Sequence, residues 1–367
     1  MIKNNPPLTI RAEQHDDYEA VLQLTYHAFL TLDYPERQRM DEHYLVHLFR
    51  DSESVVPGLS FVAERDGEIV GHILYARSKI VGADGSEKDT ITFGPLSVLP
   101  KYHKTGIGAA LVAFSMNEAK SLGYGAVMIA GVPEYYPKLG FKRASEYGIS
   151  LPDGTSPDSL MVYELVPSFL DGGGTAVFLP PEYEQCESVD GGYDEFHNQF
   201  MKEYYPGQVV LRPFWEADNK LMESWLYKDH VAKWYIRPEN WLHELNNRRG
   251  EFSFISHFIA EVEGKPIGFC QYYDCFFAQK YEAWSNQWQV GKQEGSIFSI
   301  DYLIGEQEYI GKGYGKEIVR LLSEKIRDLG GEFIIVQPEQ ANLLSRSVLE
   351  ANDFVYNGEE FVKNLRD

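Results

Sequence analysis

Two glycine-rich loops carry the clearest chemical signal in this chain. The first contains Gly106 and Gly108, and the second contains Gly311, Gly313 and Gly315. Each follows an apolar run typical of a β-strand and opens a long amphipathic helical pattern. Glycine lets the backbone approach a ligand closely, and the free N–H groups of a helix's first turn bind phosphate oxygens. Each loop is therefore predicted to hold a phosphorylated cofactor, and the repetition predicts two related domains in tandem.

The residues that the loops lack narrow the choice of cofactor. Leu111 and Ile318 stand where a dinucleotide-binding loop has its third glycine, and neither loop ends in Gly-Lys-Ser or Gly-Lys-Thr. A dinucleotide or ATP is therefore disfavoured. A lone Gly-x-Gly is also compatible with a plain turn that caps a helix. The surrounding elements have to decide between these interpretations.

The segments around both loops have the same order: strand, loop, helix, strand. The expected elements are strands at 90–98 and 126–132 around a helix at 106–122, and strands at 296–304 and 332–337 around a helix at 313–329. In the first copy a Tyr-x-x-x-Gly-Phe segment follows, from Tyr136 to Phe141. In the second copy Asn342 and Asp353-Phe354 occupy the corresponding region.

This order resembles the GNAT superfamily of acetyl-CoA-dependent N-acetyltransferases. The resemblance implies an α/β fold with two tandem GNAT-like (acyl-CoA N-acyltransferase) domains, each a mixed, mostly antiparallel twisted sheet flanked by helices. It also implies acetyl-CoA as the cofactor, with its pyrophosphate at the loop. His103 takes the place of the usual Gln or Arg before the first glycine, a mild departure because backbone N–H groups carry most of the phosphate binding.

The second half looks specifically similar to the aminoglycoside 6′-N-acetyltransferases. Five segments carry this resemblance in the right order: Val210-Leu211-Arg212-Pro213, the run from Asp229 to Tyr235, the run from Gly264 to Phe269, Ser299-Ile300-Asp301, and the run from Ile310 to Gly315. The resemblance implies a small cationic acceptor amine, such as an aminoglycoside or a polyamine.

The resemblance also implies a set of cofactor-binding residues. They are the strand residues Leu96, Val98 and Leu303, whose backbone would polarise the acetyl carbonyl, the loop residues His103, Lys104, Gly106, Gly108, Gly311, Lys312, Gly313 and Gly315, and Asn342.

In the first domain the family's proton donor corresponds to Tyr136. A phenol with a pKa near ~10 is protonated at neutral pH and can supply a proton to the departing thiolate. The alternative is that Tyr136 is a core aromatic residue beside Pro137 and Phe141, with Tyr135 as the second candidate donor.

The second domain departs from the family at this position. Leu349 stands where the tyrosine is expected and Asp353 replaces the glycine, so another group or water donates the proton, or catalysis is lost. Asp301 matches the aspartate that contacts the substrate amine in the aminoglycoside enzymes. A carboxylate there can bind an ammonium group and accept its proton. It could also be a strand-end aspartate bonded to nearby backbone.

An aromatic and acidic insertion in the second half could form a wall of the substrate pocket. Glu282, Trp284 and Trp288 are the candidate substrate-binding residues in it, and loop packing is the alternative.

The composition of the chain narrows the range of molecules that it is expected to bind. The formal net charge is −21, which disfavours nucleic acid and favours cationic small molecules, although acidity also serves solubility alone. No apolar run is long enough for a membrane helix, so we expect a cytoplasmic protein. The three cysteines have no zinc spacing, which predicts no metal site, and they are expected to be reduced. The oligomeric state is left open.

We therefore expect an N-terminal domain at 1–187, a linker at 188–207 with a short aromatic helix, and a C-terminal domain at 208–367. The expected function is acetyl transfer from acetyl-CoA to a primary amine of a small cationic molecule. Two alternatives stay open: one catalytic domain with a degenerate partner, or a non-enzymatic acyl-CoA sensor.

Overall fold

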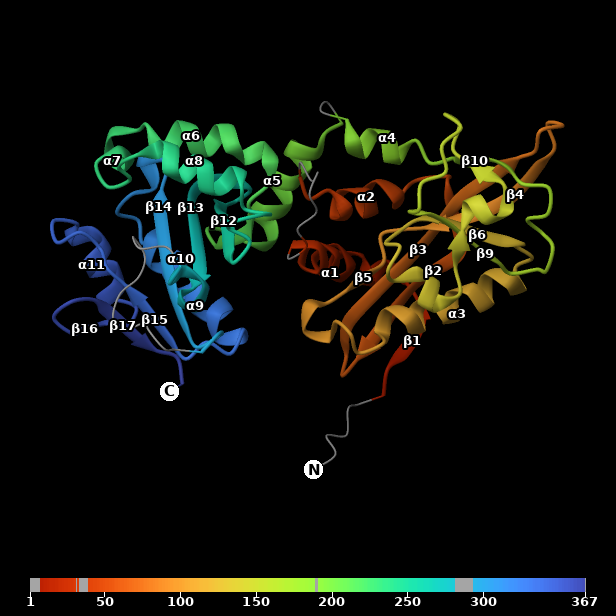
Figure 1. Ribbon diagram of the computed structural model, residues 1–367. Helices are drawn as coiled ribbons and strands as arrows, with labels where there is room; N and C mark the ends of the chain where they lie inside the picture. Colours follow the sequence, from red (N-terminus) through yellow and green to blue (C-terminus); the bar gives the residue numbers. More distant parts are fainter. Residues whose placement is uncertain (1–6, 31, 33–38, 189–190, 281–292, 367) are drawn as a thin grey trace. The chain divides into compact units, whose positions relative to one another are not determined.

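The computed structural model describes residues 7–30, 32, 39–188, 191–280 and 293–366. Apart from Leu32–Arg39, residues up to Phe196 form a first compact unit, and residues from His197 onward form a second. Each unit contains one mixed sheet with helices on both faces (Figure 1). The expected α/β fold class, with two mostly antiparallel sheets, is confirmed. The domain limits at 187 and 208 stay predictions.

The first unit is built on ten strands. Their central order is β1-β2-β3-β4-β6-β9-β7, with β5 and β10 on β3 and β8 on β10. The strands are β1 (Thr9–Ala12), β2 (Val55–Arg65), β3 (Glu68–Val81), β4 (Glu87–Phe93), β5 (Ser97–Val98), β6 (Ala126–Ala130), β7 (Lys142–Arg143), β8 (Ile149–Ser150), β9 (Leu160–Glu164) and β10 (Gly174–Phe178). The helices are α1 (Tyr18–Leu30), α2 (Glu42–Phe49), α3 (Ile107–Ser121) and α4 (Glu182–Glu187). The helix expected near residue 200 is α5 (Tyr193–Tyr204), whose residues from His197 onward belong to the second unit.

Side chains of alternating direction give this sheet two apolar faces. Phe61 and Ile73 pack with α3 through residues such as Leu111. The Val62 side chain points to the opposite face of the sheet, where it packs with Val21 of α1 and a valine of α2. The core of the first unit therefore lies in two layers, one on each side of β2 and β3.

The second unit repeats this plan with seven strands in the order β11-β12-β13-β14-β15-β17-β16. The strands are β11 (Val209–Pro213), β12 (Ile255–Val262), β13 (Lys265–Asp274), β14 (Ile297–Ile304), β15 (Phe333–Val336), β16 (Val355–Tyr356) and β17 (Phe361–Asn364). The helices are α6 (Asn219–Leu226), α7 (Asp229–Ala232), α8 (Pro238–Asn246), α9 (Cys275–Ala278), α10 (Tyr314–Asp328) and α11 (Leu343–Glu350).

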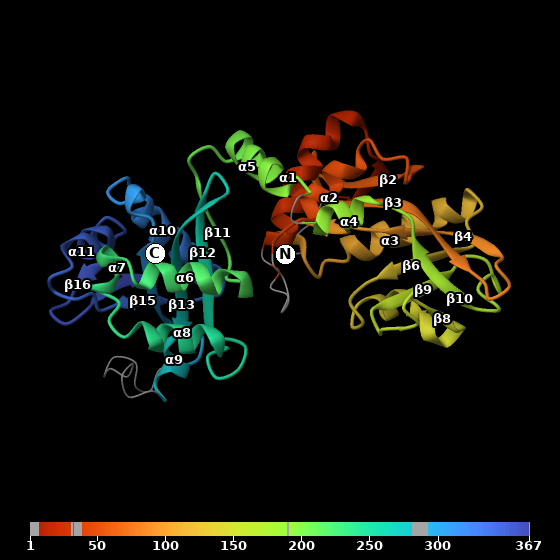
Figure 2. The ribbon, with the colours of Figure 1, turned by 90° about the horizontal axis from the view of Figure 1, so that it is seen from above.

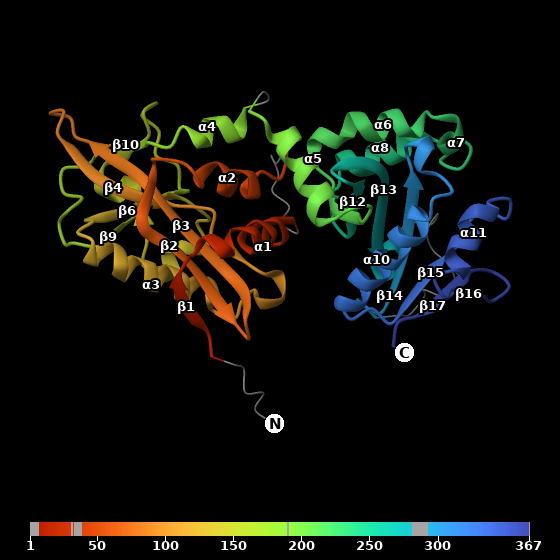
Figure 3. The same ribbon diagram turned by 180° about the vertical axis from the view of Figure 1, so that it is seen from behind.

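The two faces of the second sheet are covered by different helices. Helix α10 lies on one face of this sheet (Figure 3). Its Ile318 and Leu322 pack there in one core with Cys270. On the other face Trp225 of α6 and Leu245 of α8 pack on Phe269, and α6 and α8 lie side by side there (Figure 2). This two-sided cover positions the strand ends that carry the chemistry.

Each sheet opens at one pair of parallel strands. The ladder between β14 and β15 ends at Ser299 and Ile335, although β14 continues to Ile304. In the first unit β4 and β6 pair only at Ile91 and Val127. Beyond these points the two strands no longer hydrogen-bond, so backbone groups on one edge of β14 are available to a ligand.

The expected strand at 90–98 is interrupted. It forms β4 up to Phe93 and resumes as β5 at Ser97, with Gly94, Pro95 and Leu96 between them. Proline has no N–H to donate to a ladder, which explains why pairing stops there. The expected helices at 106–122 and 313–329 are α3 and α10, and they are confirmed.

A second duplicated feature supports the internal repeat. Arg11 binds both carboxylate oxygens of Asp17 at 2.6 and 2.9 Å and reaches Glu64 through its Nε atom. In the second unit Arg212 binds Asp218 at 2.7 and 2.8 Å and reaches Glu261 at 2.7 Å through the same atom. The arginine stands on the first strand of each sheet and ties it to the turn before the next helix.

We expect Asp218→Asn to destabilise the second unit by about 3–5 kcal/mol, because it leaves the buried Arg212 without a full counter-charge. The Arg212 side chain is 8% exposed, whereas that of Arg11 is 35% exposed. The matched variant Asp17→Asn should therefore cost only about 1 kcal/mol. Calorimetric melting of the full chain measures both, and equal losses would contradict the difference in burial.

Candidate active sites

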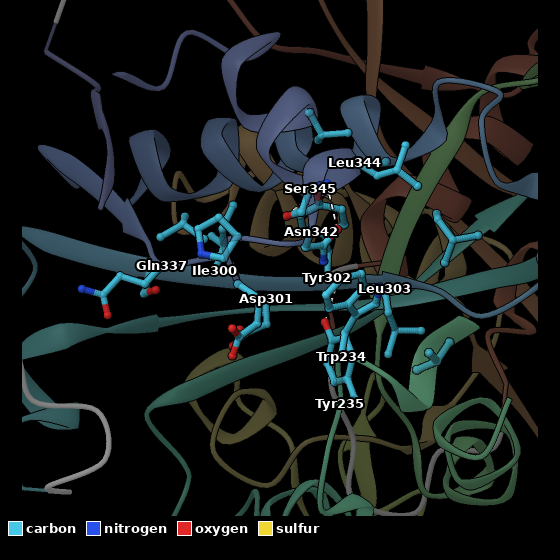
Figure 4. Close-up of a pocket in the computed structure, with 18 of the residues that line it drawn as sticks. Trp234, Tyr235, Ile300, Asp301, Tyr302, Leu303, Gln337, Asn342, Leu344 and Ser345 are labelled. Carbon is cyan, nitrogen blue, oxygen red and sulfur yellow. Dashed lines mark hydrogen bonds between the residues drawn. The ribbon is translucent and has the colours of Figure 1, made fainter. Parts of the chain in front are cut away.

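A cavity of about 870 Å³ opens in the second unit where β14 leaves β15. Its walls come from the α7–α8 region, from β14, from the glycine-rich loop before α10 and from the start of α11. Trp234 and Tyr235 form one side, and Gln337, Asn342 and Ser345 lie on others (Figure 4). The cavity thus joins the predicted cofactor loop to a region large enough for a small molecule.

Asp301 projects from β14 into this cavity (Figure 4). Burial raises the pKa of its carboxyl group to about 7, and the nearby Glu244 adds to the rise. The amide of Gln271 donates a hydrogen bond to Asp301 Oδ2 at 3.0 Å, which opposes the rise. The group is therefore poised to exchange a proton near neutral pH.

A second carboxylate lines the same cavity. Glu244 on α8 is 4% exposed, and His257 Nε2 lies 3.2 Å from its Oε1 atom. His257, Gln271 and Asp301 face one another across β12, β13 and β14 in the strand register. Glu244 and Asp301 are thus two acidic groups on one wall, linked behind it by polar side chains.

The open edge of β14 presents N–H groups to the cavity. The Gly305 N–H bonds Ile267, so by alternation the backbone of Tyr302 and Ile304 points away from β13. Their carbonyl groups already accept bonds, from the Tyr235 hydroxyl at 2.7 Å and from His230 Nε2 at 3.0 Å. The predicted contact Leu303 lines the cavity, but its own N–H lies on the β13 side.

The second loop adopts the conformation expected of a ligand cradle. Gly311 and Gly313 have φ values of 76° and 89°, which favour glycine, and no heavy atom lies within 4 Å of where a Cβ atom would stand on either. Both line the cavity with Gly315, whereas Lys312 lies over the Tyr309 ring, with Nζ 5.5 Å from its centre.

Asn342 lines the cavity and has a structural contact as well. Its Oδ1 atom accepts a bond from the Ser345 N–H and so caps α11. Glu282, Trp284 and Trp288 lie outside the described residues, so their predicted contact with substrate stays a prediction.

The first unit has the equivalent loop. Gly106 begins α3 with φ 92° and open space at its Cβ position. A Cβ atom on Gly108 would lie 3.7 Å from both Leu96 and Val98, so loop and strand edge are adjacent.

The strand edge beside this loop also presents N–H groups. The Leu99 N–H bonds Val70, and alternation therefore turns the N–H groups of Leu96 and Val98 away from β3. His103 Nε2 lies 2.9 Å from the Val98 carbonyl oxygen, and Lys104 has a left-handed backbone with φ 62°.

Comparison with known families identifies the domain that each half of the chain contains. Residues 24–141 match the acetyltransferase (GNAT) family, and residues 215–360 match the acetyltransferase (GNAT) domain. Both halves of the chain are GNAT acetyltransferase domains. The expected tandem is thereby confirmed.

Individual relatives match parts of the chain. The uncharacterized N-acetyltransferase YjhQ of Escherichia coli K12 is 35% identical over 98 residues, which are 27% of this chain and only 54% of YjhQ. Aminoglycoside N(6′)-acetyltransferase type 1 of Klebsiella pneumoniae is 26% identical over 161 residues, 41% of this chain and 75% of that enzyme. Among solved structures, E. coli YhbS in complex with CoA has a TM-score of 0.43 and 22% identity, and the match covers 50% of this chain and 96% of YhbS.

The two GNAT domains differ at the tyrosine position. In the first domain the Tyr136 ring packs among Phe93, Phe141 and Tyr135. The Tyr135 hydroxyl lies beside the loop, 3.0 Å from where a Cβ atom of Gly108 would stand, and burial raises its pKa. The predicted donor and the second candidate are therefore neighbours with different contacts.

In the second domain the same region lies on the helix α11 rather than on a short 3₁₀ turn, and it has no hydroxyl at the tyrosine position. Leu349 is fully buried in the core under α10. Asp353 adopts φ 64°, the left-handed conformation that Gly140 adopts at φ 93° in the first domain. The turn is preserved with a residue that tolerates it.

Sequence reasoning missed several residues that line this cavity or hold Asp301 in place. Glu244 has no motif around it and comes close to Asp301 only through the packing of α8. Gln271 follows the matched segment that ends at Phe269, and His230 and Tyr235 lie inside a matched segment. The strand register of β13 and β14 was the signal that could have paired Gln271 with Asp301.

For the first domain we expect Tyr136→Phe to lower turnover by about 10²–10⁴-fold while acetyl-CoA affinity is kept, because only the acidic hydroxyl is lost. Tyr135→Phe is the matched control, and it should weaken acetyl-CoA binding because its hydroxyl lies at the loop. Steady-state kinetics on an amine whose acetylation survives Asp301→Asn measures both. If Tyr135→Phe alone slowed turnover, Tyr135 would be the proton donor and Tyr136 would be the residue that supports acetyl-CoA binding.

The raised pKa of Asp301 predicts a pH-dependent stability. The folded chain holds this proton more tightly than the unfolded chain, whose aspartate titrates near its ordinary 3.8. The contribution of this proton to the free energy of unfolding is fully present below pH 3.8 and is lost as the pH rises to about 7. Asp301→Asn cannot lose a proton, so its stability should exceed that of the parent by a gap that grows from pH 4 to pH 7. Urea unfolding measures the gap, with the rim variant Glu339→Gln as control; a constant gap would contradict the shift.

Proposed function

We propose that the chain is an acetyl-CoA-dependent N-acetyltransferase that acetylates a primary amine of a small cationic molecule. The observation that carries this proposal is the cavity of the second domain. There a carboxyl group with a pKa of about 7 lies beside a strand edge of free N–H groups and a glycine-rich loop. We place the reaction in the cytoplasm; none of the described helices is long and apolar enough to cross a membrane.

The loops fit the phosphates of acetyl-CoA. Open space at Gly106 and Gly313 lets a ligand approach the backbone, and the first turns of α3 and α10 leave N–H groups without helical partners. Lys104 and Lys312 add positive charge beside the two loops. When bound, acetyl-CoA supplies a thioester whose acetyl group is open to attack by an amine. The solved YhbS relative was crystallised with CoA.

The strand edges supply the polarising donors. The N–H groups of Ile304 and Tyr302 in the second domain, and of Leu96 and Val98 in the first, face the space between the diverging strands. Fixed N–H donors stabilise the negative charge that develops on a carbonyl oxygen during acyl transfer. They need no movement to do so, because the ladder on the other side of each strand holds them.

Asp301 supports the choice of a cationic acceptor. Its ionised form binds an ammonium group and passes one of its protons to water, which leaves a neutral amine that can attack and a carboxylate that can take the second proton during the attack. Glu244 places a second carboxyl group among the lining residues, which suits a substrate with more than one amino group. The relative from Klebsiella pneumoniae is an aminoglycoside N(6′)-acetyltransferase, which supports an aminoglycoside or a polyamine as the acceptor.

Two alternatives make different predictions. If one domain is a degenerate scaffold, acetyl-CoA binds once per chain rather than twice. If the protein is a non-enzymatic acyl-CoA sensor, acetyl-CoA binds but no amine in a broad panel releases CoA. The loss of the family tyrosine at Leu349 is the observation that favours a reduced second domain.

The decisive experiment is a thiol-release screen of polyamines and aminoglycosides, followed by Asp301→Asn. For an amine used by the second domain, we expect the variant to lose about 2–5 kcal/mol in kcat/KM, because the charge partner of a buried ammonium group is removed. Acetyl-CoA affinity should not change. Glu339→Gln, an exposed carboxylate at the rim, is the control and should cost less than about 1 kcal/mol. Equal activity of parent and Asp301→Asn would make Asp301 structural.

A further inference from the structure

Tyr302 follows Asp301 on β14, and the two side chains point to opposite faces of the sheet. Asp301 faces Gln271 and α8, whereas the Tyr302 ring packs with the core beneath α10. A Cβ atom on Gly315 would lie 3.5 Å from Tyr302 Cε2. The ring therefore lies against Gly315, the last glycine of the cofactor loop, on the side of the strand away from Asp301.

The Tyr302 hydroxyl is held at the wall of the cavity. It donates a hydrogen bond to Ser345 Oγ at 3.2 Å, and both residues line the cavity. Burial raises the pKa of Tyr302 to about 12, so the phenol keeps its proton across the neutral range. A half-buried phenol at this position is a stable proton store next to the loop.

Ser345, the hydrogen-bond partner of Tyr302, lies on α11. This helix also carries Leu349, which stands where the family has its tyrosine. Ser345 and Leu349 are four residues apart on α11, so they lie on one face of the helix, one turn from each other. Leu349 is buried and has no acidic proton. The Tyr302 hydroxyl reaches this face of α11 from β14. It contacts the helix one turn before Leu349.

We propose that Tyr302 is the proton donor to the leaving thiolate in the second domain, which rests on the proposed acetyl transfer. As the bond from the amine nitrogen to the acetyl carbon forms and the carbon–sulfur bond breaks, Asp301 takes the proton of the amine. Tyr302 gives its phenol proton to the sulfur and then regains one from water. Consecutive residues on opposite faces of one strand thus serve the two ends of the reaction.

Tyr302→Phe in the full chain tests the assignment on an amine whose acetylation requires Asp301. The variant should lose about 10²–10⁴-fold in kcat while the KM for acetyl-CoA stays within about twofold, because the ring and its packing remain. Tyr272→Phe is the matched control: it removes a phenol hydroxyl from the same core, but Tyr272 does not line the cavity, and turnover should be kept. Unchanged kcat in Tyr302→Phe, or an equal loss in Tyr272→Phe, would overturn the proposal.

A measurement without any amine separates this proposal from the proposed function. A phenol that faces the sulfur stabilises the thiolate and lowers the pKa of the thiol of bound coenzyme A. Thiolate absorbance during a pH titration of the coenzyme A complex should show a higher thiol pKa in Tyr302→Phe than in the parent and in Tyr272→Phe. Coenzyme A bound to the first domain adds the same background to all three proteins.

The two experiments then have distinct outcomes. A thiol pKa that depends on Tyr302, in a chain that acetylates no amine, would sink the proposed function and leave the placement of the phenol at the sulfur standing. An identical thiol pKa in all three proteins would place the phenol away from the sulfur and overturn the inference.

Discussion

The structure depends on one backbone constraint, the divergence of two parallel strands. While β14 and β15 stay paired, their N–H and C=O groups satisfy each other, and past Ser299 this pairing stops. Backbone groups that lose their ladder need other partners, because an unpaired buried group is costly. The cavity opens where this pairing stops, and both Asp301 and the N–H groups that point away from β13 lie on the unpaired stretch of β14.

Duplication has preserved the framework of the two domains more strictly than their chemistry. The arginine, aspartate and glutamate network on the first strands is the same in both, atom for atom. The left-handed turn at Gly140 and Asp353 is also kept. By contrast, the tyrosine of the first domain corresponds to a buried leucine in the second, and the aspartate on β14 corresponds to Pro95 when the pairs Gly71 with Val98 and Gly268 with Ile304 are aligned. The residue types at these two positions therefore differ between the domains, although the framework is the same.

The sequence was sufficient for the features that depend on local rules. Glycine spacing at Gly106 and Gly313 predicted two loops and the helices after them, because left-handed φ values and free helix starts are local properties. It was insufficient where the contacting residues lie far apart in the chain. The contact of Gln271 with Asp301 depends on strand register, and the approach of Glu244 depends on where α8 packs. The break in the strand at Pro95 follows from a local rule, since proline cannot continue a ladder. The β-rich residues around Pro95 nevertheless favoured the prediction of one continuous strand.

The occupied carbonyl groups on the open strand edges have a consequence for selectivity between kinds of ligand. A strand edge is normally a template for another peptide, which must find donors and acceptors in alternation. Here side chains have already taken the acceptors: His103 binds the carbonyl group of Val98, His230 that of Ile304, and Tyr235 that of Tyr302. An incoming peptide strand meets donors without matching acceptors, whereas a ligand that brings a single carbonyl oxygen finds all that it needs. The same edges can therefore lie open within a cavity and still resist pairing with another chain.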